Sequence, residues 1–499
     1  MTRMNVCPFP RWLAGGLLLI AAGARAENFL PYPDDPFGTR AGVATGPGRA
    51  AVAADWADPC RIDRKPPKTW SLPDVMDQAL CHNPQTHQAW ANALFQATQL
   101  GQAEAAYLPT VNFTMPISRS RNTAGSGFSN SIAISGAGAG ITNRQNEFTR
   151  VSPTLNINYL LLDFGGREAR VELARHALEA ANWSHAATLQ TVLFQAIQAY
   201  YQVFASNASL EAAEATVRSN EEALKAASFR YEVGAAALVD KLQAQTAFNQ
   251  ADVNRQTAAG NARVALGTLA NVMGLKPRDT LQIEPPATDG PVEERERDVQ
   301  AMIEEAKGLR PDLAAAEAQI KAAESNVQSA RSGSLPTLSL VGNFIYDDNI
   351  GVRQTPSWVV GVQMAVPLFT GFLNTYQIHG AEVQVAQRAA DRDKLDRSIA
   401  LDVWRAYYQL HTAKETLRST EDLLAAATKS EEIALGRYKA GAGNIVELLN
   451  ATASLANARF QRVQSQYNWR IGKAQLAQAI GALDLGAMTR ETAGRGKGR

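Results

Sequence analysis

The sequence predicts an α+β membrane protein in which four lipid-facing strands join long paired helices, and in which several copies close one structure. Three observations predict this class. The chain contains an internal repeat, each repeat holds two segments of alternating apolar and polar residues, and long segments without proline follow both pairs. No run of eighteen apolar residues is present, so a helical membrane protein is excluded.

The composition is that of a large folded protein with almost balanced charge. Of the 499 residues, 45% are hydrophobic and 19% are charged, which is too apolar for a disordered chain. The 49 basic side chains nearly match the 48 acidic ones, and no large basic block is present. A protein that binds nucleic acid by neutralising phosphates is therefore excluded.

The N-terminus has the pattern of an export signal. Its longest apolar stretch, residues 13–22, follows Arg3 and Arg11 and ends in the small-residue cleavage site Ala24-Arg25-Ala26. We therefore predict a signal peptide over residues 1–26. A short membrane anchor is the alternative, but the stretch is short for a span.

Cysteine usage agrees with export. Once Cys7 leaves with the signal, only Cys60 and Cys81 remain. In an oxidising compartment a disulfide between them would close a loop and stabilise the folded protein by ~3 kcal/mol. Two buried thiols are the alternative. Neither cysteine has a His or Cys neighbour at metal-binding spacing, and no cofactor or metal site is expected.

The most informative feature is a duplication. Asn83-Pro84 matches Arg310-Pro311 at an offset of 227, whereas later matches lie at an offset of 207. The later matches join Ala199-Tyr200-Tyr201-Gln202 to Ala406-Tyr407-Tyr408-Gln409, Arg230-Tyr231 to Arg437-Tyr438, and Gly234 to Gly441. A constant offset leaves no room for insertions, as expected of packed helices. The change in offset coincides with Ser118–Arg150, which is rich in Gly, Ser and Asn and is predicted to be a surface loop.

The duplication also gives the domain organisation. We predict an extended N-terminal segment over 27–68, then a first repeat of helix, two strands and long helical hairpin over 69–275. A Pro-rich linker over 276–297 leads to the second repeat over 298–482. Residues 483–499 form a basic tail that is predicted to be disordered.

Each repeat contains two predicted strands with one apolar face and one uncharged face. The alternating apolar residues are Val111, Phe113, Met115 and Ile117; Leu155, Ile157, Tyr159 and Leu161; Leu338, Leu340, Phe344 and Tyr346; and Trp358, Val360, Val362, Met364 and Val366. A soluble sandwich gives the same alternation. The uncharged polar face and the aromatic residues near the strand ends favour strands that face lipid.

The rest of both repeats is predicted to be helical. Residues 74–106 and 299–331 precede the strand pairs, and residues 166–229 contain no proline, which as one helix is ~90 Å long. From Leu210 to Tyr231 apolar residues recur at alternating spacings of three and four, interrupted once by Asn220. This spacing is typical of a coiled-coil seam, and an ordinary bundle core is the alternative.

Four strands cannot close a transmembrane barrel, because the smallest such barrels have about eight. An open sheet in lipid would leave unpaired backbone groups at its edges, which is strongly unfavourable. The chain is therefore expected to oligomerise, and three copies supply twelve strands. The predicted assembly is a trimer with a 12-stranded transmembrane β-barrel and a long α-helical coiled-coil barrel.

The sequence shows no motif of catalytic residues, and we predict that the protein is not an enzyme. The six histidines are scattered, without a His-Glu-x-x-His pair, and no Gly-x-Ser-x-Gly elbow occurs. The glycine-rich run at 136–140 has no following helix, so a flexible loop is favoured over a phosphate-binding loop. Adjacent carboxylates such as Glu221-Glu222 point to different faces of a helix.

The motifs that occur in duplicate carry a family resemblance. Asn-Pro before a helix, Leu-Pro-Thr at a strand start and Arg-Tyr-x-x-Gly within a hairpin resemble TolC-like outer-membrane factors over roughly residues 70–482. The resemblance implies a homotrimeric duct in the outer membrane of a Gram-negative bacterium, with a helical barrel that crosses the periplasm. It implies as partners a periplasmic membrane-fusion adaptor, an inner-membrane transporter of the ABC or RND type, and outer-membrane lipid.

The family divides between type I protein secretion and small-molecule efflux. The string Ala-Leu-Cys-His-Asn-Pro-Gln-Thr at 79–86, with Cys60 upstream, looks like members near the cyclolysin secretion component. Secretion is therefore the preferred function, and efflux of drugs or metals is the alternative. A soluble periplasmic coiled-coil adaptor is a further alternative, but it does not explain the strands. In a duct of this type the pump chooses the cargo.

The resemblance also places functional residues at the turns between paired helices. Gly234 and Gly441 are expected to contact the adaptor, and a plain helix C-cap is a compatible alternative role. Tyr438 matches the family's gate tyrosine, and Asp240 matches its hydrogen-bonded partner. Gly443 stands where the family has a gate arginine.

Two further positions match acidic rings at the family's constriction. They are Glu447 and Asn450, so only one of the two rings would be charged. Three copies of Glu447 around one narrow lumen would attract cations. The alternative is a carboxylate favoured only by the dipole at a helix N-terminus.

Overall fold

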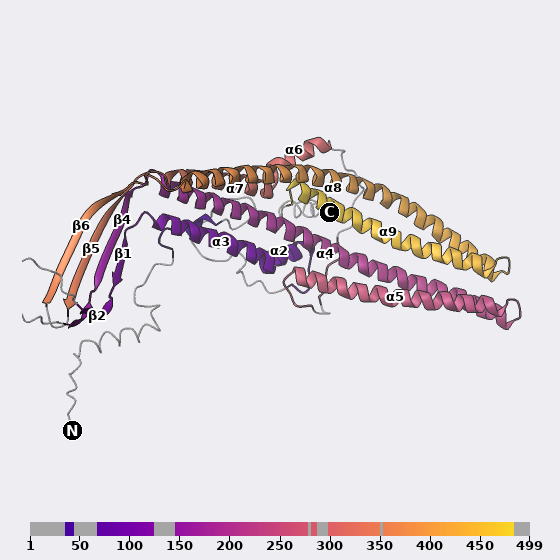
Figure 1. Cartoon of the computed structure of the whole chain (residues 1–499). Coiled ribbons are helices and arrows are strands. Elements are labelled where there is room, and N and C mark those ends of the chain that lie inside the picture. The colour runs from indigo at the N-terminus through magenta and orange to yellow at the C-terminus, as the bar shows by residue number, and fades with distance from the viewer. Residues whose placement is uncertain are drawn as a thin grey trace, which may run out of the picture.

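The computed structural model describes residues 35–43, 67–123, 145–277, 281–286, 298–349 and 353–483. Its elements form a long body, with a sheet at one end and the turns of two helical hairpins at the other (Figure 1). The predicted signal peptide, Cys60, and most of the predicted N-terminal segment, linker and tail lie outside the described residues, so these remain predictions.

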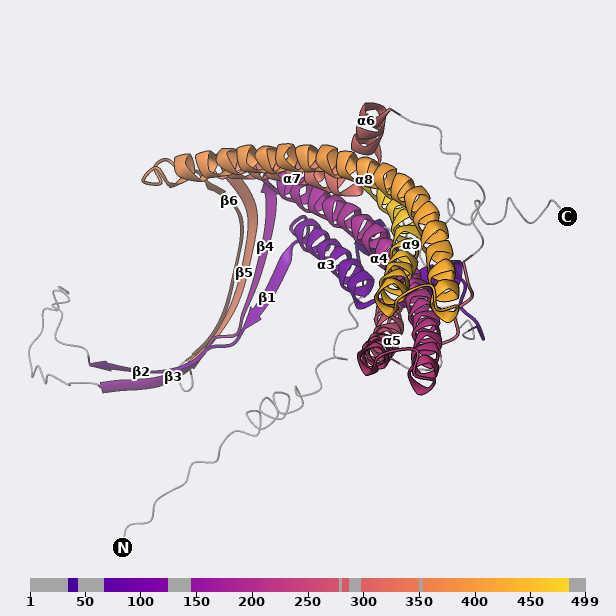
Figure 2. The same ribbon diagram turned by 90° about the vertical axis from the view of Figure 1, so that its right-hand side faces the viewer.

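The strands form one antiparallel sheet that both repeats build. The first repeat supplies β1 (Thr110–Thr114), β2 (Ile117–Thr123), β3 (Gln145–Val151) and β4 (Thr154–Leu162), and the second supplies β5 (Thr337–Asn349) and β6 (Arg353–Ala365). β4 pairs with β1 on one side and with β5 on the other, and β5 also pairs with β6. Figure 2 shows the strands bending as they leave the helices.

The first strand pair extends further than expected. β2 and β3 pair from Ile117↔Val151 to Thr123↔Gln145, so the prediction of a loop over Ser118–Arg150 was wrong at both ends. Pro116 and Pro153 lie where the two long strands divide. Proline has no N–H to donate to a ladder, which explains both breaks.

The two outer strands expose large apolar side chains. On β1, Val111 and Phe113 are 59% and 66% exposed, and on β6, Trp358 and Met364 are 73% and 64% exposed. Within the described residues, β1 and β6 each pair on one side only. An exposed apolar face with free edges indicates a surface that lipid and further strands cover.

The helices confirm the predicted long pairs. α4 (Gly166–Glu232) and α8 (Leu373–Lys439) each have 67 residues, and the offset of 207 aligns both of their ends. Each chain segment returns through a shorter helix, α5 (Leu238–Val272) after α4 and α9 (Ile445–Ile480) after α8. The alanine-rich, proline-free sequence lets these helices continue unbroken and approach closely. In the part of the chain that the structure describes, no helix is both long and apolar enough to cross a membrane.

Each predicted helix before a strand pair is divided in two. α2 (Leu72–His82) and α3 (Pro84–Ala105) meet at Asn83, and α6 (Val299–Leu309) and α7 (Pro311–Ser332) meet at Arg310. Proline at the first position of the second helix disfavours helical backbone in the residue before it, which explains the breaks.

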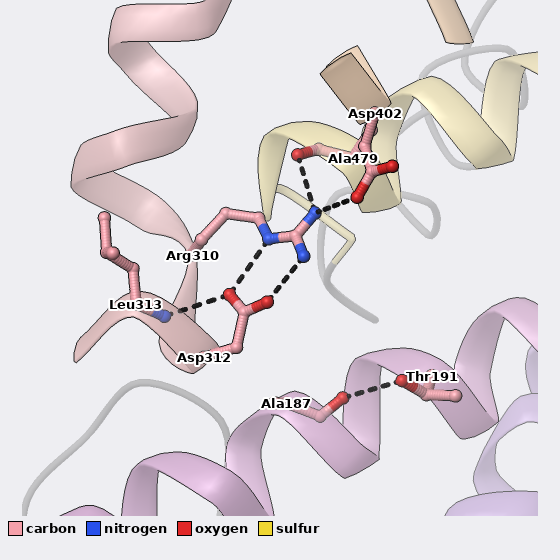
Figure 3. A network of polar contacts seen from close by, with 7 residues as sticks. All are labelled: Ala187, Thr191, Arg310, Asp312, Leu313, Asp402 and Ala479. Carbon is pink, nitrogen blue, oxygen red and sulfur yellow. Dashed lines mark hydrogen bonds and ion pairs between the residues drawn. The ribbon is translucent and has the colours of Figure 1, made fainter. Parts of the chain in front are cut away.

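At the second of these breaks, Arg310 is held by three elements (Figure 3). Its Nε and Nη2 donate to Oδ1 and Oδ2 of Asp312 at 3.0 and 2.5 Å. Its Nη1 donates to the Ala479 carbonyl on α9 at 3.3 Å and lies 3.9 Å from Oδ2 of Asp402 on α8. The break is therefore fixed to the second long hairpin.

Each repeat has its own hydrophobic core, and the two cores use matching elements. The first core contains Val192, Ala196 and Tyr200 of α4 with residues of α2 and α5. The second contains Ile399 and Val403 of α8 with residues of α6 and α9. The duplication in sequence is therefore a duplication of packed units.

The part of the N-terminal segment that is described is not extended throughout. Thr39–Gly42 forms a 3-10 turn (η2), and buried Val43 follows it in a cluster with residues of α3 and α4. The Asn182 side chain on α4 donates to the Gly42 carbonyl at 2.8 Å. This piece of chain is therefore attached to the helical body.

Candidate functional site: the hairpin turns

The residues that the sequence singled out gather at the turns that join α4 to α5 and α8 to α9. Both turns lie at the end of the molecule opposite the sheet (Figure 1). A hydrophobic cluster joins the two hairpins just before the turns, and it contains residues from all four helices: Ala223, Ala227, Ala244, Ala434, Tyr438, Ile445 and Leu448. The site is thus formed by both repeats together.

The two glycines close their helices in the same way. Gly234 has φ 73° and Gly441 has φ 82°, a left-handed conformation that other residues adopt at a cost. The next amide donates back to the arginine carbonyl, from Ala235 to Arg230 at 2.7 Å and from Ala442 to Arg437 at 2.9 Å. Both glycines are exposed, and a Cβ added to either would meet no atom within 4 Å. The C-cap role is therefore observed, and the surface over both turns is open.

Tyr438 is the central buried side chain of the site. It is 1% exposed, and its hydroxyl has no hydrogen-bond partner among the described residues. The hydrogen bond to Asp240 that the resemblance implied is therefore not present in this structure. Burial raises the pKa of the Tyr438 phenol, Arg230 opposes this, and the Asp240 charge adds to it.

Arg230 instead makes the contact between the hairpins. Its Nη1 donates to the Tyr438 carbonyl at 2.8 Å, and its guanidinium carbon lies 4.8 Å from the centre of the Tyr438 ring. Its Nη2 donates to the Ala235 carbonyl in its own turn at 3.3 Å. One side chain therefore ties the first turn to the second hairpin through a hydrogen bond and a cation–π contact.

Glu447 is paired, which the sequence did not indicate. Its Oε1 lies 2.7 Å from Nη1 of Arg437, and both side chains are about half exposed. The Asn444 side chain accepts from the Glu447 amide at 2.7 Å, so Asn444 is the N-cap of α9. Asn450 lies one turn further along α9 and is exposed. The single charged ring expected from Glu447 thus has a cationic partner in each chain.

Sequence reasoning missed the roles of three residues here. Arg230 and Arg437 were visible only as parts of the Arg-Tyr-x-x-Gly motif, and the motif gives no indication that one arginine reaches Tyr438 while the other pairs with Glu447. A signal for Asn444 was present, because Asn three residues before Glu is a helix-start pattern.

The described residues also bear on metal binding and on the predicted disulfide. They contain no group of three or more His, Cys, Asp or Glu side chains placed to hold a metal ion. Cys81 is disulfide-bonded, and Cys60 lies outside the described residues, so the pairing of Cys60 with Cys81 remains a prediction.

The fold is that of outer-membrane channels. The CmeC outer membrane channel of Campylobacter jejuni aligns over 90% of this chain and 98% of its own, with a TM-score of 0.70 at 16% identity. The outer membrane protein VceC of Vibrio cholerae aligns over 82% of this chain and 96% of its own, with a TM-score of 0.67 at 21% identity. The predicted fold class is confirmed.

The chain belongs to the outer membrane efflux protein family, whose model matches residues 75–275 and 302–482. The two matched ranges correspond to the two repeats. Protein CyaE of Bordetella pertussis is 29% identical over 478 residues, which cover 94% of both chains. Outer membrane protein TolC of Vibrio cholerae is 26% identical and covers 83% of this chain and 91% of its own. The suspected TolC-like family is confirmed, and the protein lies in the outer membrane and extends into the periplasm.

Proposed function

We propose that this protein is the exit duct of a tripartite export system, working as a homotrimer with a periplasmic adaptor and an inner-membrane transporter. Three copies of the four-stranded sheet region would join β6 of one copy to β1 of the next and so remove the free edges. The long hairpins would then form the periplasmic part of the duct.

The observation that carries this proposal is the pair of equivalent turns at the end away from the sheet. Both expose a glycine with open space above it, and both lie beside the hydrophobic cluster that joins the two hairpins. Gly234 and Gly441 supply the adaptor contact, since a surface without a side chain lets a partner's backbone approach closely. Tyr438, Asp240, Glu447 and Asn450 form the constriction, where separation of the hairpins opens the passage.

For the cargo, we propose type I protein secretion. The string at 79–86 resembles cyclolysin-type secretion members, and the match to Protein CyaE spans nearly the whole of both chains. Small-molecule efflux is the second candidate, because relatives include the pyoverdine export outer membrane protein OpmQ of Pseudomonas aeruginosa, 25% identical over 82% of this chain. A soluble periplasmic adaptor is not supported, because the chain belongs to a family of outer membrane proteins.

A paired export assay in a deletion strain tests the function. It scores secretion of large glycine-rich repeat proteins and sensitivity to dyes, detergents and antibiotics. Lost protein secretion with unchanged drug sensitivity is expected. Increased drug sensitivity with normal secretion would instead make this chain the outer part of an efflux pump.

Complementation with turn variants tests the adaptor contact. Gly234→Asn and Gly441→Asn add a side chain over the turn, and Asn is among the residues that best tolerate positive φ. Gly308→Asn is the control, because Gly308 is also exposed with open space around it but lies on α6, away from the turns. Both turn variants should assemble in the outer membrane yet lose export, while the control exports normally. Normal export by both turn variants would show that these glycines do not contact the adaptor.

A further inference from the structure

A recess lies between three of the long helices. α4, α5 and α9 surround a space of about 720 Å³ there, over residues 199–216, 251–268 and 456–464. None of the twenty residues that line this recess is charged. The same three stretches nevertheless contain seven charged residues: Glu211, Glu214, Asp252, Arg255, Arg263, Arg459 and Arg462. The three helices therefore direct their charges away from the recess.

The lining combines side-chain amides with small residues. Eight of the lining residues are alanine, which lets the backbone of a ligand approach the helices closely. Asn261 on α5 and Asn457 on α9 are exposed and have no hydrogen-bond partner in the part of the chain that the structure describes. The hydroxyls of Thr216, Thr257 and Thr268 donate to carbonyls of their own helices, so their oxygens remain able to accept. The recess thus offers both donors and acceptors without charge.

The recess opens on the face of α4 opposite α2. Tyr200 is buried in one cluster with Val75 and Ala79 of α2, whereas Gln202 lines the recess. Residues two apart in a helix lie ~200° apart around its axis, so Tyr200 and Gln202 point to opposite sides of α4. α6, which is the equivalent of α2 in the second repeat, lies outside the arc that α8 makes (Figure 2). In a closed ring of helices the recess therefore faces the passage.

We propose that this recess binds the backbone of the unfolded polypeptide that passes through the duct. The proposal rests on the proposed function and adds a site for its cargo. Each peptide group of an unfolded chain carries an N–H donor and a carbonyl acceptor, and a side-chain amide supplies the complement of both. An uncharged lining of this kind accepts acidic and basic segments alike, and each neutral hydrogen bond is weak enough to release the chain again.

Photocrosslinking to arrested cargo tests the site in the assembled duct. The cargo is a secreted polypeptide joined, at the end that leaves last, to a domain that folds before export, so that its chain stays in the duct. A p-benzoylphenylalanine at position 261 or 457 should crosslink to this chain. Position 211 is the matched control, because Glu211 is exposed and lies ~200° around α4 from Ser209, which lines the recess.

Two results of this experiment would overturn the proposal. One is arrested cargo that crosslinks to neither position 261 nor position 457. The other is cargo that crosslinks to position 211 as strongly as to these two, because the recess would then not be distinguished from the outer face of α4.

Substitutions within the recess give an independent measurement, which is the crosslinking yield from a probe at position 254, also in the lining. Asn261→Leu combined with Asn457→Leu removes two amides at similar size and should lower this yield roughly fivefold. Asn261→Gln combined with Asn457→Gln keeps both amides and should leave the yield near that of the parent. Equal yields in the two double variants, at equal amounts of assembled protein in the membrane, would oppose the proposal.

The outcomes separate this site from the proposed function. Cargo that is arrested in the duct but never crosslinks to the recess overturns the site alone. Normal protein secretion in the deletion strain overturns the proposed function, and the site with it. Unchanged crosslinking in the double leucine variant, together with increased sensitivity of that strain to uncharged drugs, would assign the recess to small molecules instead.

Discussion

Asn83 and Arg310 hold the same place in the two repeats, although one is a neutral amide and the other a cation. The Asn83 Nδ2 donates to the Val272 carbonyl at the end of α5 at 2.9 Å, and the Arg310 Nη1 donates to the Ala479 carbonyl at the end of α9 at 3.3 Å. Val272 and Ala479 are themselves equivalent at the offset of 207. Each interrupted helix is therefore fixed to its own hairpin by a side chain that satisfies a free carbonyl at a helix end.

The glycines that follow these helix ends lie against the same breaks. A Cβ at Gly274 would lie 2.1 Å from the His82 carbonyl oxygen, and Gly274 also has φ 70°. Gly274→Ala should therefore destabilise the protein by clearly more than the roughly 1–2 kcal/mol that a left-handed backbone alone costs. The measurement is the thermal unfolding midpoint of the purified protein by far-UV circular dichroism.

Gly234→Ala is the matched control, because Gly234 has φ 73° but open space around it. It should show the backbone cost without the clash. Equal shifts of the midpoint in the two variants would mean that the contact between Gly274 and His82 adds nothing to stability.

The large features of the fold could be predicted because they follow from periodicity. The constant offset predicted equivalent helices, and α4 and α8 indeed have equal lengths. The continuation of β2 and β3 past Ser118 could not be predicted from a stretch rich in Gly, Ser and Asn, because pairing with a neighbouring strand overrides a weak local preference.

The site was predictable in position but not in its contacts. The motif Arg-Tyr-x-x-Gly placed Tyr438 and both glycines at the turns, since a glycine at a helix end is a local signal. Which partner an arginine side chain reaches depends on how two hairpins pack, and a sequence pattern does not contain that information. Arg230 and Arg437 consequently share the contact of Nη2 with a carbonyl of their own turn and differ in the partner of Nη1.

The contacts of Arg230 predict that this side chain, and not the Tyr438 hydroxyl, keeps the hairpins together. Arg230→Gln removes a charged hydrogen bond and a cation–π contact, so it should favour the open duct by roughly tenfold. Tyr438→Phe removes a buried hydroxyl that has no hydrogen-bond partner in the described part of the chain, so resting conductance should stay close to that of the parent. Single-channel conductance in planar bilayers measures both. A conductance increase in Tyr438→Phe but not in Arg230→Gln would reverse these assignments.

The ion pair of Glu447 with Arg437 predicts opposite effects for two substitutions at the entrance. Glu447→Gln leaves an unpaired cation in each chain and should lower the cation preference of the open duct, whereas Arg437→Gln leaves an unpaired carboxylate and should raise it. Reversal potentials in a salt gradient report the preference, and the effect should weaken at high salt. Glu304→Gln on α6 is the control for Glu447→Gln, because it makes the same charge change away from the turns. If selectivity is the same in both entrance variants as in the control, this pair does not line the passage.

Glu431 on α8 lies near the contact between the hairpins, and its ionisation should make the stability of the protein depend on pH. Burial raises the pKa of its carboxyl, Arg459 on α9 opposes this, and Glu222 on α4 and the adjacent Glu432 add to the rise, while Lys439 opposes it. Lys439 also lies 3.6 Å from Glu222, so the charges of α4 and α8 face each other here. The folded state therefore favours the protonated form of Glu431.

A raised folded pKa fixes the sign of the pH dependence. The stability that the neutral Glu431 carboxyl contributes to the folded protein is fully present below the unfolded pKa of about 4.3. It is lost as pH rises through the raised folded pKa. Glu431→Gln keeps the side chain neutral at every pH, so this variant should unfold at a higher temperature than the parent at neutral pH. The difference should shrink as the pH falls toward the unfolded pKa. Glu421→Gln is the control, because Glu421 lies on the same helix, is exposed and is 3.5 Å from Arg462, and a surface pair of this kind contributes little. A difference between Glu431→Gln and the parent that stays constant with pH, or that grows on acidification, would show that folding does not raise the pKa of Glu431.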